Sequence, residues 1–96
     1  MQNQIQISEL ENIISERIYI KIENWNLYLG DAGLARNLAI QCISNIEHLP
    51  KEAAKLSLQS IQVKVGDCKE SISLFKLVTS SQIYELEEIL ENFFSN

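Results

Sequence analysis

The sequence predicts one mostly helical α+β domain. The chain has 96 residues, which is enough for one compact unit and too few for two. Over most of the chain apolar side chains recur every three or four residues, the spacing of one face of an α-helix. Between residues 61 and 75 the spacing changes to two, which is typical of a half-buried strand. We therefore expect one domain over residues 1–96, with residues 1–7 frayed.

A long N-terminal helix is predicted over residues 8–29. Ser8 and Glu11 make a capping box, in which each side chain can accept the backbone N–H of the other residue. Gly30 offers a left-handed stop. An alternative stays open, because residues 18–22 are rich in β-branched side chains and also suit a short strand. The apolar stripe of the predicted helix consists of Leu10, Ile14, Ile18, Ile22, Trp25 and Leu29.

The same segment carries further apolar and aromatic side chains whose role the pattern leaves open. A second apolar line either packs inside the protein or contacts another chain, and in the second case the candidate interface is Ile13, Ile20 and Leu27. The aromatic side chains belong either to the core or to an apolar cleft, and in the second case the lining residues are Tyr19, Trp25 and Tyr28.

Two shorter helices, a hairpin and a final helix follow. Asp31 can cap the second helix, and Pro50 suits the first turn of the third. A β-hairpin is predicted at about 61–65 and 71–75, with its apolar face on the helices because two strands alone are marginally stable in water. Thr79 to Gln82 form a second capping box. The helix that begins there has an apolar stripe and an acidic opposite side.

Composition and charge exclude several classes of protein. The net charge of −5 disfavours a nucleic-acid partner, because Lys and Arg supply most non-specific affinity for phosphates. Apolar runs reach about three residues, far short of the roughly 18 that a transmembrane helix needs. The N-terminus has neither the basic start nor the apolar run of a targeting peptide. We expect a soluble, acidic protein that is at most peripheral to a membrane.

Residues that could carry chemistry are few. Cys42 and Cys68 are the two thiols and form no paired motif, which favours a reducing compartment. With His48 they make three soft ligands with no close pair, so no metal site is expected. His48 has no nucleophile at motif spacing, and no phosphate-binding or nucleotide motif is present. We expect neither a cofactor nor enzymatic activity, and we leave the reactivity of Cys68 open.

Several core and turn motifs point to a family. The first half contains Tyr19-Ile20-Lys21-Ile22, Trp25, Leu27-Tyr28-Leu29 and Asp31-Ala32-x-Leu34. The second half contains Leu58-Gln59-Ser60-Ile61-x-Val63, a glycine-containing turn and Leu74-Phe75-x-Leu77. With these motifs the chain resembles a family of short cyanobacterial proteins of unknown function, some of which are described as thylakoid-associated. The resemblance covers most of the chain, and it implies a cytoplasmic setting near the thylakoid membrane and no known reaction.

Two hypotheses of function follow from these observations. The first is a non-enzymatic protein-interaction or assembly-assisting protein that docks peripherally on a thylakoid protein complex and buries Ile13, Ile20 and Leu27. A homodimer is also compatible with a core this thin. The alternative is a small-ligand or pigment-binding protein that uses an apolar cleft lined by Tyr19, Trp25 and Tyr28.

Overall fold

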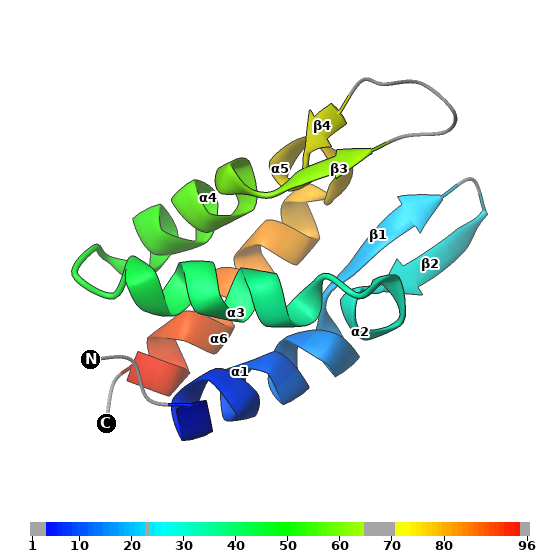
Figure 1. Ribbon diagram of the computed structural model, residues 1–96. Coiled ribbons are helices and arrows are strands. Elements are labelled where there is room, and N and C mark those ends of the chain that lie inside the picture. Colours follow the sequence, from blue (N-terminus) through cyan, green and yellow to red (C-terminus); the bar gives the residue numbers. More distant parts are fainter. Residues whose placement is uncertain (1–3, 23, 65–70, 95–96) are drawn as a thin grey trace.

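The computed structural model describes residues 4–22, 24–64 and 71–94, and it confirms the mostly helical α+β class (Figure 1). Within these residues lie six helices and two antiparallel strand pairs. In chain order the elements are α1 (Gln4–Arg17), β1 (Tyr19–Ile22), β2 (Trp25–Tyr28), α2 (Leu29–Ala32), α3 (Ala35–Ser44), α4 (Pro50–Ser60), β3 (Gln62–Lys64), β4 (Ser71–Ser73), α5 (Leu74–Leu77) and α6 (Ser80–Phe94).

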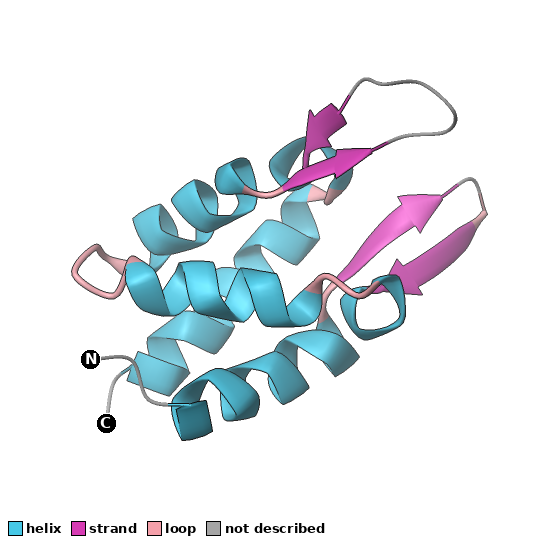
Figure 2. Cartoon of the chain, in the orientation of Figure 1, coloured by secondary structure: helices cyan, strands magenta, loops and turns pink. Residues whose placement is uncertain are grey.

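The four longer helices form the body of the molecule, and both hairpins lie at one end of it (Figure 2). α1 packs mainly against α3, and α6 packs mainly against α4. Their apolar faces meet in one contiguous core, because burying the apolar stripe of a helix requires a facing element. The largest side chains in this core that are essentially inaccessible to solvent are Leu10, Ile14, Ile18, Leu29, Leu38, Leu58, Leu74, Leu86 and Leu90.

The predicted helix over residues 8–29 is wrong in its extent. α1 ends at Arg17, and the chain continues as the hairpin β1–β2, in which Tyr19 pairs with Tyr28 and Ile22 with Trp25. The strand alternative for residues 18–22 is therefore the correct one. β-branched side chains lose rotamer freedom in a helix and pack well on a pleated sheet, which favours the strand here.

The start of α1 also differs from the prediction. The helix begins at Gln4, so Ser8 lies inside it instead of capping it. Residues 4–7 are helical where fraying was expected, and the side chain of Ile7 is buried. Ile7 precedes Leu10 and Ile14 by three and seven residues, so it extends the same buried helix face. Burial of this side chain explains why the helix continues beyond the expected cap.

The left-handed stop predicted at Gly30 lies at Gly33 instead, and Gly30 has a different role. The left-handed residue is Gly33, with φ 74°, and it separates α2 from α3 where one continuous helix was expected. Gly30 lies inside α2 at a close approach to α1. A Cβ on Gly30 would be 2.8 Å from the Cβ of Ser15, so the two helices meet here because glycine has no side chain.

The second half of the chain largely follows the prediction. Pro50 occupies the first turn of α4, as expected. In the second hairpin Val63 pairs with Ile72, while Leu74 begins α5 instead of continuing the strand. The Leu74 amide donates to the carbonyl oxygen of Ile61 at 2.8 Å, which joins the hairpin to the end of α4. Residues 65–70, including Cys68 of the predicted hairpin loop, lie outside the described residues.

The predicted N-terminal cap of α6 is confirmed in one of its two hydrogen bonds. The Thr79 hydroxyl oxygen accepts the backbone N–H of Gln82 at 3.3 Å. Gln82, expected to bond back to Thr79, instead accepts the backbone N–H of Tyr19 through its side-chain Oε1 at 3.0 Å. Since the Gln82 side chain is buried, this bond joins the first hairpin to the last helix inside the protein.

The substitution Gln82→Ala should destabilise the protein by about 1–3 kcal/mol, because it leaves the Tyr19 N–H without its acceptor. Urea denaturation followed by circular dichroism measures the effect. Gln59→Ala is the matched control, since Gln59 is exposed on α4 and should change stability by less than about 0.5 kcal/mol. Equal stability of the two variants would contradict the role given to this hydrogen bond.

The substitution Gly30→Ala should destabilise the protein by about 1–3 kcal/mol, because the added methyl group overlaps Ser15. Ser15→Gly removes the Cβ that the methyl group meets. A double-mutant cycle should therefore show a smaller cost of Gly30→Ala in the Ser15→Gly background. Strictly additive effects would mean that the contact between α1 and α2 is not what selects glycine.

Candidate functional site

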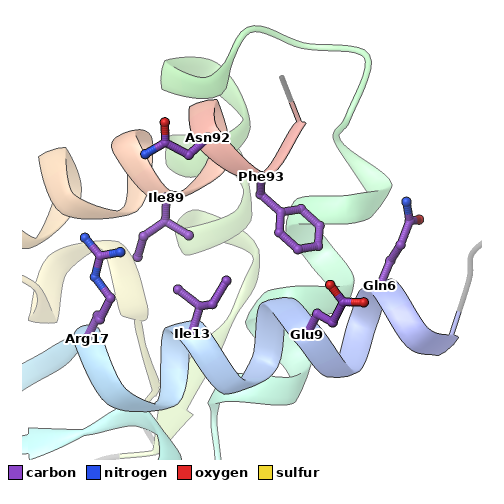
Figure 3. A pocket seen from close by; sticks show the side chains of 7 residues that line it. All are labelled: Gln6, Glu9, Ile13, Arg17, Ile89, Asn92 and Phe93. Atoms are coloured by element: carbon purple, nitrogen blue, oxygen red, sulfur yellow. The ribbon is translucent and has the colours of Figure 1, made fainter. Parts of the chain in front are cut away.

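A groove of about 440 Å³ lies between α1 and α6 (Figure 3). Its apolar side chains come from both helices, and those of Ile13 and Ile89 point toward each other. The polar side chains around them are exposed to solvent. The complete lining consists of Gln6, Glu9, Ile13, Arg17, Ile89, Asn92 and Phe93.

Helical spacing and helix packing together produce this groove. The α1 residues that line it follow one another at intervals of three or four, so they share one face of the helix. α1 packs most closely on α3 and α6 on α4, and this division leaves the seam between α1 and α6 partly open. Near one end of the groove the Arg17 guanidinium bridges the seam and forms an ion pair with Glu85 of α6.

Of the three predicted interface residues, Ile13 alone lines the groove. Ile20 and Leu27 are directly opposed partners in the β1–β2 hairpin, where both pack against the core. Ile20 is 5% exposed, too little for a contact surface. The predicted helical line through the three residues is therefore wrong, because a seven-residue interval that spans a hairpin brings the two residues face to face across it.

Two of the three residues predicted to line an aromatic cleft, Tyr19 and Tyr28, form a pair of contacting rings. Tyr19 and Tyr28 are directly opposed on the two strands, and their rings meet edge to face with centroids 5.3 Å apart. Strand alternation puts this pair on the face of the hairpin opposite Ile20 and Leu27. The backbone of Trp25 pairs with Ile22. The two rings contact each other, and neither lines the groove between α1 and α6.

Cys42 is a buried thiol between α3 and α4. Burial raises its pKa from 9.0 to about 12, and a hydrogen bond with Ser57 opposes this shift. Asn45 donates to the Ser57 hydroxyl oxygen at 3.1 Å, so the polar groups here satisfy one another. A neutral thiol is a poor nucleophile at physiological pH. Cys42 is thus a structural residue of the helix interface.

His48 is exposed in the segment after α3, and its amide donates to the carbonyl oxygen of Asn45 at 3.0 Å. The structure places it on the surface, whereas Cys42 lies in the core. Within residues 4–22, 24–64 and 71–94, no three His, Cys, Asp or Glu side chains are close enough together to hold a metal ion.

Sequence reasoning missed most of the groove. Phe93 and Ile89 belong to the apolar side of the predicted last helix, and Ile13 belongs to the second apolar line of the first. These patterns identify surfaces that need a partner, but they do not say that the first and last helices lie next to each other. The two helices lie about 80 residues apart in the sequence, and no local pattern predicts that they pack side by side.

The described part of the chain contains no helix with the length and apolar character needed to span a bilayer. Its fold defines a small, mostly helical α+β protein with a solvent-open groove between its first and last helices.

The chain matches the model of a family described as "Protein of unknown function (DUF3181)" over residues 7–93, and it belongs to that family. A curated relative from Synechocystis sp., named "Thylakoid-associated protein slr0729", is 30% identical over 90 residues, which cover 92% of this chain and 89% of the relative. These similarities confirm the family resemblance inferred from the sequence motifs. No solved structure matches the chain.

The burial of Cys42 predicts a pH dependence of stability. Between pH 9 and 12 the unfolded chain releases the thiol proton while the folded protein keeps it, so folding stability falls as the pH rises. Relative to Cys42→Ala, the wild-type protein should lose about 1.4 kcal/mol between pH 8 and pH 10. Urea denaturation of both proteins at the two pH values measures this difference. Parallel pH profiles would show that the thiol ionises freely in the folded protein.

Proposed function

We propose that this protein is a non-enzymatic interaction or assembly-assisting protein that docks peripherally on a thylakoid protein complex through the groove between α1 and α6. The observation that carries the proposal is this solvent-open groove, in which apolar side chains of two helices are surrounded by polar ones. Protein interfaces combine an apolar centre with a polar, solvent-accessible rim in the same way.

The setting of the proposal comes from the Synechocystis relative, whose name describes it as thylakoid-associated. A protein that docks on a membrane complex needs a contact surface outside the bilayer, and the groove offers one. The relative aligns over most of both chains, so the similarity includes both groove helices.

A small-ligand site is the competing function. The volume of about 440 Å³ is within the range of such sites. However, four of the seven lining residues are exposed, whereas small-molecule sites enclose most of the ligand surface. This exposure favours a macromolecular partner that supplies the missing wall.

A catalytic function would require acid, base or nucleophilic groups positioned together. The ionisable side chains that line the groove are Glu9 and Arg17, and Arg17 is engaged by Glu85. A single exposed carboxylate beside an ion pair supports binding better than proton transfer, and for this reason we propose a non-enzymatic role.

The double variant Ile13→Ala/Phe93→Ala should weaken binding to purified thylakoid membranes about tenfold or more, because truncating central apolar contacts removes the largest contributions to an interface. Co-sedimentation at several protein concentrations measures the affinity. The matched control is Tyr84→Ala/Ile46→Ala, which truncates two exposed side chains outside the groove and should bind like the wild-type protein. Circular dichroism checks that all the variants are folded.

Protease-treated thylakoids and vesicles of extracted thylakoid lipids identify the kind of partner. A protein complex as partner predicts that binding is lost after proteolysis and is absent from the lipid vesicles. Binding to protein-free vesicles with unchanged affinity, or wild-type binding by the groove variant, would contradict the proposed function.

A further inference from the structure

We infer that the occupant of the α1–α6 groove is a basic, amphipathic helical segment of the partner protein. This inference rests on the proposed function and adds the chemistry of the partner to it. It is carried by the charge on the two groove helices, the length of the groove and the hydrogen bonding of the backbone in its walls.

The net negative charge of the protein is concentrated on the two helices that form the groove. α1 and α6 carry seven carboxylates and one guanidinium, a net charge of −6, whereas the whole chain carries −5. The remainder of the chain therefore has a net charge of +1. Glu9 and the paired Arg17 line the groove itself, and the other carboxylates lie elsewhere on the two helices. A net negative charge on both helices that form a groove favours a partner of the opposite sign and speeds its association.

Ion pairs within the protein neutralise a small part of this charge. Arg17 pairs with Glu85, and Arg36 of α3 pairs with Glu11 at 3.1 Å. Within the described part of the chain, the other carboxylates of α1 and α6 have no ion pair. They are Glu9, Glu16, Glu87, Glu88 and Glu91.

The dimensions of the groove suit a helix. Its lining on α1 extends from Gln6 to Arg17, which is about 16 Å, or three turns, at the rise of an α-helix. An amphipathic helix of similar length presents three or four apolar side chains at intervals of three or four residues. Ile13 and Phe93, both half-buried, provide the apolar surface that such side chains would cover, and the buried Ile89 lies beneath them.

The backbone of the groove walls also favours a helix over an extended peptide. Both walls are α-helices, whose N–H and C=O groups are bonded within the helix except at the ends. An extended peptide in the groove would find no strand edge with which to pair its own backbone groups. A helix satisfies these groups internally, so it can approach an apolar surface without that cost.

A fluorescently labelled synthetic peptide tests the inference directly. The probe is a helix of 14 residues with Leu at every third or fourth position and Lys at most others. One comparison peptide has the same composition in an order that breaks the apolar stripe, and another has Glu in place of Lys. Fluorescence anisotropy should show that the probe binds at least about tenfold more tightly than either comparison peptide, with an affinity that falls as salt screens the charges.

Variants of the protein locate the binding site. Glu9→Gln should weaken probe binding about two- to fivefold, the effect expected for an exposed charge pair, whereas Glu47→Gln removes an exposed carboxylate outside the groove and should have no effect. Ile13→Ala/Phe93→Ala should weaken binding more strongly. Equal binding of the stripe-broken peptide, equal binding of the acidic peptide, or equal effects of the two Gln variants would each overturn the inference.

The peptide and membrane experiments separate this inference from the proposed function. If the groove variant loses thylakoid binding and the probe fails to bind the wild-type protein, docking through the groove stands and the basic helix is overturned. If the probe binds in the groove but thylakoid binding is unaffected by the groove variant, the basic-helix chemistry stands and the proposed function is overturned.

Discussion

One long-range hydrogen bond inside the protein joins the first part of the chain to the last. The Ile18 amide donates to the carbonyl oxygen of Ile14, so Tyr19 is the first residue after α1 whose amide needs a partner outside the helix. Gln82 Oε1 provides that partner from the first turns of α6. The bond joins the base of the first hairpin to α6 and, together with the Arg17–Glu85 ion pair, holds the ends of the two helices next to each other.

The same arrangement explains the properties of the groove. α1 and α6 bury their main apolar stripes on α3 and α4, so Ile13 and Phe93 on their common seam are only partly covered, while Ile89 is buried. Both helices are acidic, and like charges on neighbouring surfaces raise the free energy of the unbound protein. A basic partner would relieve this repulsion and would also cover Ile13 and Phe93. Electrostatic attraction and apolar contact would then act at the same surface.

Local signals predicted much of the second half of the chain. Pro50 at the start of α4, the Thr79 cap of α6 and the pairing of Val63 with Ile72 all depend on residues close in sequence. The first half was harder, because an interval of four residues fits a helix and is also twice the period of a strand. Ile14, Ile18 and Ile22 satisfy both patterns, so the spacing alone did not show where α1 ends.

The sequence by itself therefore determined the fold class, the acidic charge, the later caps and turns, and the family resemblance, because each depends on composition or on neighbours along the chain. The tertiary structure decided where α1 ends, which residues the first hairpin pairs, and that α1 and α6 share a groove. The reason is physical: the Tyr19 amide finds its acceptor 63 residues away, and the two groove walls come from opposite ends of the chain. No local pattern encodes either contact.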